Sequence, residues 1–225
     1  MRPNVTLRLI LKDLRMNRTL TVFPLVGGLA ALSVMLNGGQ TSLVLGGGFF
    51  FIAMILCASM VPMSNIVNER KRQTLAFMMS LPVSAAQYGT AKLVSSLGMF
   101  LVPWLTLVGA ALYLIRDRHV LPAGTIPTAL ILANLPCVGF CLITGTVLVA
   151  ESEVWGIAVL VVLNSSYWIV WYLLASRAPS VTQTWTSPVV VWNAVAVDIL
   201  AAEFAVIMGV LALSLVLQSR KRNFI

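Results

Sequence analysis

Charged side chains are scarce in this chain of 225 residues, because Asp, Glu, Lys and Arg together make up only 10% of it. A soluble globular domain usually carries about 25%. Hydrophobic residues reach 59%, so the composition excludes an ordinary soluble enzyme, a disordered chain and a nucleic-acid-binding module. The seven acidic residues and the single His form no cluster at catalytic or metal-binding spacing, which weighs against an enzyme embedded in the membrane.

Cysteine is also rare, and all three cysteines (Cys57, Cys137 and Cys141) fall in apolar runs. Cys137 and Cys141 are four residues apart, so a helix would place them on one face. They are then either a pair of metal ligands or two small buried hydrophobic side chains. No His or carboxylate accompanies them on that run, and this favours the second interpretation.

Long stretches without charge are abundant. A helix needs roughly 20 mostly apolar residues to cross the hydrocarbon core of a bilayer. Residues 19–68 are free of charge and provide two such helices, separated by the turn-forming sequence Asn37-Gly38-Gly39-Gln40. We therefore expect an all-α membrane protein, with one transmembrane domain over residues 1–225. Its six spans are predicted at about 19–37, 43–63, 93–115, 126–149, 155–176 and 198–217.

Basic residues are divided unevenly between the two sides that six spans define. Twelve of the 15 Lys and Arg residues precede the first span, lie between the second and third spans, or follow the last span. The other side holds Arg116, Arg118 and Arg177. Since Lys and Arg concentrate in cytoplasmic loops, this bias predicts that both termini are cytoplasmic. The basic residues before the first span are too dispersed for a signal peptide, so we expect that span to be uncleaved.

Residues 4–18 have the pattern of an amphipathic basic helix. Its apolar positions are Leu7, Ile10, Leu11 and Leu14, and its basic positions are Arg8, Lys12 and Arg15. Such a helix suits the cytoplasmic membrane interface, where anionic lipids attract its cations. We favour an in-plane helix followed by a turn near Asn17. The alternative is a simple cytoplasmic extension of the first span.

The segment 64–92, between the second and third spans, has the character of a docking loop. A charged cluster from Glu69 to Arg72 opens it, and a short apolar stretch follows up to Leu81, before Pro82 interrupts the helical pattern. Exposed Met and Phe side chains on a short helix suit a groove on a partner protein. From physics alone, an interfacial helix resting on lipid is the alternative.

This segment resembles the second-to-third cytoplasmic loop of permease subunits from ABC exporters of the second type. The matching features are Glu69 and Arg70, Thr74-Leu75, the apolar run to Leu81, Pro82-x-Ser84, and Gly89 with Lys92. The chain departs from the family pattern at Gln73, where Gly is common, and in the two residues that separate Gly89 from Lys92. The six-span layout and the basic N-terminal helix extend the resemblance over the whole chain.

The resemblance implies a coupling helix that fits a cleft on a separate ATP-binding subunit. The residues expected to contact that subunit are Glu69, Arg70, Arg72, Thr74, Leu75, Phe77, Met78, Leu81 and Pro82. Glu151 and Glu153, in the short loop between the fourth and fifth spans, are a possible second contact or are simply solvated. The chain has no Gly-x-x-x-x-Gly-Lys-Ser/Thr sequence, so it would bind no nucleotide itself.

ATP and Mg would therefore sit on the partner subunit, with two ATPase copies and a second permease chain, expected to form a homodimer. The resemblance places this assembly in the cytoplasmic (inner) membrane as an exporter that works by alternating access.

Four polar residues in the apolar stretches are candidates for a translocation path or gate: Asn134, Asn164, Asp198 and Glu203. The last apolar stretch is too long for one span, so we expect a short outer-face or re-entrant helix at about 188–196, and Asp198 as the cap of the sixth span. For Glu203, a gate and a pairing inside the bundle are equally supported. The two asparagines either line a polar path or form interhelical hydrogen bonds, the commoner use.

Two other functions are compatible with these residues. An ion-coupled secondary carrier would use Glu203 or Asp198 as a proton or cation site, and it would need no ATPase. A non-transporting membrane assembly subunit would need neither. The mixed-charge loop at 64–92 is not required by either alternative, and the permease of an ATP-driven exporter is therefore the leading hypothesis.

Overall fold

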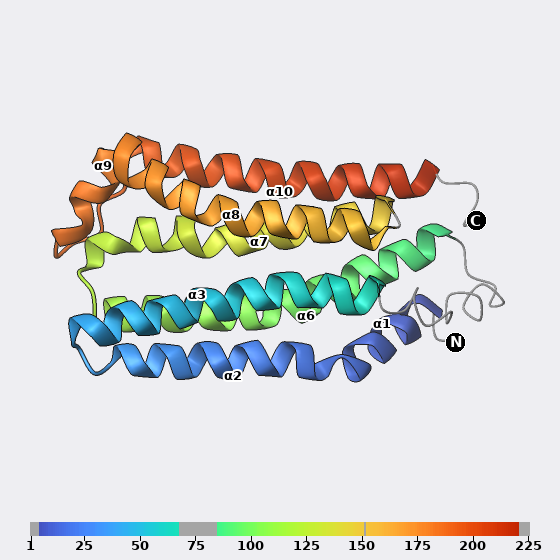
Figure 1. Ribbon diagram of the computed structural model, residues 1–225, viewed down its shortest axis with the longest axis horizontal. Helices are drawn as coiled ribbons and strands as arrows, with labels where there is room; N and C mark the ends of the chain where they lie inside the picture. The colour runs from blue at the N-terminus through green and yellow to red at the C-terminus, as the bar shows by residue number, and fades with distance from the viewer. Residues whose placement is uncertain (1–4, 68–84, 151, 221–225) are drawn as a thin grey trace.

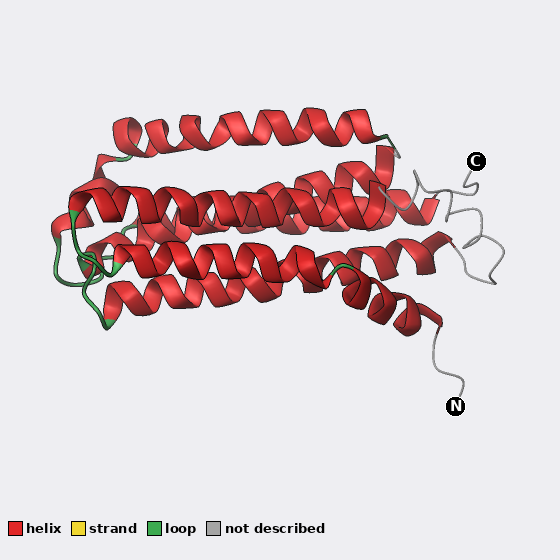
Figure 2. Cartoon of the chain, turned by 60° about the horizontal axis from the view of Figure 1, so that its bottom comes forward, coloured by secondary structure: helices red, strands yellow, loops and turns green. Residues whose placement is uncertain are grey.

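A computed structural model describes residues 5–67, 85–150 and 152–220, and within these ranges the chain forms helices and no strands (Figures 1 and 2). The long helices are α2 (Arg18–Met35), α3 (Gln40–Pro62), α6 (Ala85–Arg116), α7 (Ile126–Ala150), α8 (Glu153–Arg177) and α10 (Ala194–Arg220). Shorter elements are α1 (Val5–Met16), the π-helix η1 (Met63–Val67), the 3₁₀ turns η2 (Ala123–Thr125) and η3 (Gln183–Thr186), and α9 (Pro179–Thr182).

Six of these helices are long and apolar enough to cross a membrane. The prediction of an all-α protein with six membrane-spanning helices is thus confirmed for the described residues. The six lie side by side, and the chain passes between the two ends of the bundle with each helix in turn (Figure 1). We call the end where α1 begins and α10 finishes the terminal end. The distal end is the one that holds the turns between α2 and α3 and between α6 and α7.

The N-terminal helix α1 is separated from α2 by the single residue Asn17, and it leaves the bundle at an angle to α2 (Figure 1). The predicted break near Asn17 is therefore present. Leu9 and Asp13 are buried against the bundle, while Leu7 and Leu11 stay exposed. An in-plane position at the membrane interface remains a prediction, although two exposed leucines next to basic residues are consistent with it.

The centre of the bundle is α7, the helix with the largest share of buried residues among the six. Its middle turns pack with α3, α6 and α10 in one core cluster that includes Cys57, Cys137 and Cys141. In this cluster the rings of Phe100 and Phe140 stack with their centroids 4.4 Å apart. The cysteines are thus buried apolar side chains of the core, as their surroundings in the sequence indicated.

A glycine permits a close approach between α2 and α3. A Cβ atom on Gly46 would lie 2.8 Å from the carbonyl oxygen of Ala31 and would also overlap Met35. Only a residue without a side chain permits this approach. Gly47 and Gly48 have no atom within 4 Å of such a Cβ position, so the three consecutive glycines are not equivalent.

The distal end is closed by a cap in which η2 and η3 pack together. Gly124 N donates to the carbonyl of Ser187 at 3.0 Å, and the indole of Trp185 donates to Thr128 Oγ1 at 2.8 Å. The short helical segment before the sixth span therefore lies at 179–186, and the prediction of 188–196 was wrong. The segment begins at Pro179, and Pro188 follows its end.

The sixth long helix also begins earlier than expected, and its cap is a different residue. The Oδ1 atom of Asn193 accepts a hydrogen bond from the backbone N–H of Ala196 at 2.7 Å, which is N-cap geometry. Asp198 lies inside the first turns of α10 and is exposed. The prediction that Asp198 caps this helix was wrong, because α10 begins at Ala194 and Asn193 supplies the cap.

Candidate functional site

One polar pair is buried between α7 and α10. Asn134 Nδ2 donates to Glu203 Oε2 at 3.0 Å, and both side chains are buried. Asn134 Oδ1 and Glu203 Oε1 have no hydrogen-bond partner among the described residues. The arrangement joins two spans by an interhelical hydrogen bond. One oxygen of each side chain remains a buried acceptor without a donor among the described residues.

The other two polar candidates are not part of this pair. Asn164 on α8 and Asp198 on α10 are both exposed on the bundle. Of the four residues predicted to line a path or gate, the fold thus brings together Asn134 and Glu203 and leaves Asn164 and Asp198 apart. A role in translocation stays a prediction for all four.

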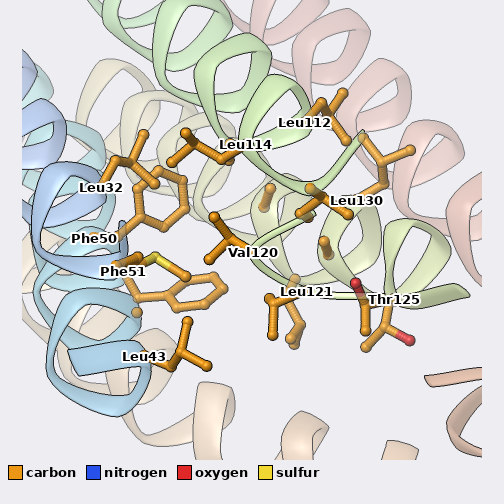
Figure 3. A pocket seen from close by; sticks show the side chains of 18 of the residues that line it. Leu32, Leu43, Phe50, Phe51, Leu112, Leu114, Val120, Leu121, Thr125 and Leu130 are labelled. Carbon is orange, nitrogen blue, oxygen red and sulfur yellow. The ribbon is translucent and has the colours of Figure 1, made fainter. Parts of the chain in front are cut away.

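An apolar cavity of about 370 Å³ lies in the distal half of the bundle. Figure 3 shows it between α2, α3, α6 and α7, with Leu32 and Phe50 on one wall and Leu130 on the other. Its few polar contributors include Thr125 and Thr128 near the distal cap, and the Thr128 hydroxyl already accepts from Trp185. A volume at the lower end of known ligand sites, walled by aliphatic and aromatic side chains, suits a hydrocarbon chain or an aromatic ring but no charged group.

The terminal end of the bundle holds a second buried polar group that the sequence did not reveal. Lys92 Nζ and Asp13 Oδ2 are 2.7 Å apart, and each side chain is only 2% exposed. Asn65, Ser95 and Ser96 are fully buried beside them. We call these five residues the terminal-end polar cluster.

Lys92 was expected only as part of the family motif, and no partner was expected for Asp13. The available signal was weak. Asp13 is the single acidic residue in a strongly basic stretch, and on a helix it falls near Leu9 rather than on the face of Arg8 and Arg15. The partner could not be found, because it lies 79 residues further along the chain.

The residues predicted to dock on an ATPase subunit, Glu69 to Pro82, lie outside the described residues, as does Glu151. What the structure does place is the two ends of that segment. η1 finishes at Val67 and α6 starts at Ala85, both at the terminal end of the bundle (Figure 1). Helix α6 therefore occupies part of the predicted loop 64–92, whose last eight residues are helical.

Comparison with known proteins gives one positive finding. Residues 8–212 match the family described as "ABC-2 family transporter protein". No curated protein and no solved structure matches the chain significantly. The match covers all six long helices up to the last turns of α10, and it agrees with six apolar helices suited to a membrane. The chain is therefore a multi-pass membrane protein that belongs to the ABC-2 transporter family, the permease component that works with an ATP-binding-cassette ATPase.

Proposed function

We propose that this chain is the membrane-spanning subunit of an ATP-driven exporter in the cytoplasmic membrane, with both termini in the cytoplasm. Residues 64–92 couple ATP hydrolysis on a separate ATPase to alternating access. The chain itself binds no cofactor, and ATP and Mg are held by two copies of the partner. The observation that carries the proposal is the family match over residues 8–212, because it joins the coupling motif and the six spans in one unit.

The placement of the helix ends supports this assignment. The start of α1, the end of η1, the start of α6 and the end of α10 lie at one end of the bundle (Figure 1). Twelve of the 15 basic residues belong to the sequence segments that join or extend these ends. A side rich in Lys and Arg is the cytoplasmic side in most membrane proteins, and the cytoplasm is where an ATPase partner is found.

The exposed face of α8 supports a second permease chain in the assembly. Asn164 projects from a span with its side chain exposed, and Trp168 is 78% exposed one turn later. An amide that faces hydrocarbon finds no hydrogen-bond partner there. Polar side chains in membrane spans usually form hydrogen bonds with a neighbouring helix. A homodimer in which two α8 helices meet would give each Asn164 a partner of the same kind.

Co-purification and ATP hydrolysis test the proposal. The chain is expressed with the ATP-binding-cassette ATPase encoded beside it, the complex is purified through a tag on this chain, and ATP hydrolysis is measured in lipid vesicles. We expect the ATPase to co-purify. Phe77→Ala and Glu69→Ala should each lower the permease-dependent hydrolysis by at least about fivefold, the lower end of typical coupling between sites.

Phe23→Ala is the matched control, because Phe23 is 68% exposed on α2 and lies within the first span. It should leave hydrolysis unchanged. If no ATPase co-purifies, the proposed function is wrong. If the ATPase co-purifies but Phe77→Ala retains full stimulation, the docking assignment within segment 64–92 is wrong.

A further inference from the structure

The terminal-end polar cluster is centred on an ion pair between α1 and α6. Lys92 Nζ donates to Asp13 Oδ2 at 2.7 Å, and Ser95 Oγ donates to the same oxygen at 3.2 Å. Each charged side chain is 2% exposed. The pair therefore lies inside the protein, although α1 and α6 are far apart in the sequence.

Asn65 connects the ion pair to a third element, η1, which continues α3. Its Oδ1 accepts from Lys92 Nζ at 3.4 Å. Its Nδ2 donates to Ser95 Oγ at 3.0 Å and to Ser96 Oγ at 2.8 Å. Asn17 Nδ2, at the junction of α1 and α2, donates to the same Oδ1 at 3.3 Å. One connected set of hydrogen bonds thus holds α1, η1 and α6 together.

A cluster of this type fixes geometry more than it adds stability. Removing two charges from water is costly, and the mutual attraction of a buried pair compensates only when the geometry is good and further hydrogen bonds are present. Here Ser95 and Asn65 supply those bonds. A helix of 12 residues such as α1 is marginal in isolation, so its position depends on contacts with the bundle. The cluster is the specific part of that contact.

In the sequence, residues of the cluster flank the segment that the proposed function assigns to contact with the ATPase. Asn65 precedes residues 68–84 and Lys92 follows them, on η1 and α6 respectively. Helices α3 and α6 continue from these points through the bundle to its distal end (Figure 1). A rigid link between these two points makes a displacement of the segment move both helices together.

We propose that Asp13 and Lys92 are positioning residues for coupling: their buried ion pair joins α1 to α6, and Asn65 ties η1 to it, so that the three elements move together. This inference rests on the proposed function, since it assumes that the segment is displaced by an ATPase. It assigns a role that a cluster retained only for stability would not have.

The test uses the complete complex of permease and ATPase in lipid nanodiscs. Hydrogen exchange of two distal-end segments, residues 36–39 and 117–122, is measured with and without ATP and vanadate, which together trap the ATPase after hydrolysis. The double-neutral variant Asp13→Asn/Lys92→Gln removes both charges of the buried pair together, so it should fold. The charge-swapped variant Asp13→Lys/Lys92→Asp restores the pair in reverse. Arg15→Gln is the matched control, because Arg15 is an exposed cation on the same helix.

We expect the double-neutral variant to retain the ATPase and to hydrolyse ATP. Its nucleotide-dependent change in distal exchange should fall by at least about fivefold, the lower end of typical coupling. The charge swap should recover half or more of the change, and Arg15→Gln should behave as wild type. The proposal is overturned if the double-neutral variant keeps the full distal change, or if the charge-swapped protein is folded and as uncoupled as the double-neutral one.

Failure of the proposed function has a different signature. In that case the wild-type permease does not retain the ATPase, or ATP and vanadate change nothing at its distal end. Either result overturns the proposed function and this inference together. A wild-type response that survives neutralisation of the pair overturns the inference alone.

Discussion

The side-chain amide of Asn134 on α7 donates a hydrogen bond of 3.0 Å to the carboxyl group of Glu203 on α10, and both residues are buried. In a span, each of these groups is costly without a partner. The bond therefore explains how two polar residues are accommodated inside the bundle. Two hypotheses for Glu203, pairing with Asn134 and ion transport, make different predictions for its variants.

Glu203→Gln should be tolerated, because the glutamine carbonyl can accept the same hydrogen bond from Asn134. Glu203→Leu leaves the buried Asn134 amide without an acceptor and should lower stability by about 1–3 kcal/mol. The stability of both variants is measured by thermal unfolding in detergent, with the reactivity of the buried cysteines toward a thiol probe as the signal. Equal destabilisation by the two variants would contradict the pairing. A carrier that used Glu203 as its ion site would instead lose the ion dependence of transport in Glu203→Gln.

Gly46→Ala should destabilise the α2–α3 pair by about 1–3 kcal/mol, the usual cost of overpacking, since its Cβ would lie 2.8 Å from Ala31 O. Gly48→Ala is the matched control on the same helix, because nothing lies within 4 Å of its Cβ position. It should be neutral or stabilise by about 0.5–1 kcal/mol. Denaturation of the purified variants in the same detergent compares them, and similar stabilities would show that α2 and α3 are not in close contact at Gly46.

Ala111→Leu should be accepted with little loss of stability, because Ala111 lines the apolar cavity of about 370 Å³ and the added carbons enter empty volume. Ala58→Leu is the control, since Ala58 is 3% exposed and belongs to the packed core around Cys57. That change should cost about 1–3 kcal/mol. The comparison uses unfolding midpoints of the two variants. A larger loss for Ala111→Leu would mean that the cavity is filled by neighbouring side chains.

Cysteine labelling tests the orientation without a cysteine-free background. Cys57, Cys137 and Cys141 are 2%, 8% and 1% exposed, so wild-type protein in membranes should not react with an impermeant maleimide. His119→Cys, at the exposed distal loop, should be labelled from outside intact cells. Arg15→Cys, on α1, should be labelled only after permeabilisation. The reverse pattern would show that the termini face outwards.

Asn164→Leu should weaken self-association while leaving the fold of each chain intact, because Asn164 is exposed on α8. Interhelical hydrogen bonds in membranes contribute about 0.6–2 kcal/mol, so the dissociation constant should rise roughly 3- to 30-fold. Single-molecule photobleaching in lipid vesicles gives the fraction of dimers. Ser165→Ala, at a neighbouring exposed position whose hydroxyl bonds Val161 O within α8, is the control.

The sequence alone determined the class of the protein. Charge-free runs of span length fix six membrane helices, because the bilayer admits no other way to satisfy the backbone over such apolar stretches. The distribution of Lys and Arg predicted which side is cytoplasmic, and the motif from Glu69 to Lys92 indicated the family. Each of these signals is local, so each can be read without knowledge of the fold.

Only the tertiary structure decided which polar residues meet. Asp13 pairs with Lys92 and Asn134 with Glu203, across sequence separations of 79 and 69 residues. Periodicity assigns a residue to a helix face, but all six helices are apolar around most of their circumference, so it does not indicate which face meets which neighbour. The packing of α7 at the centre made that choice. It buried Asn134 and left Asn164 on the surface.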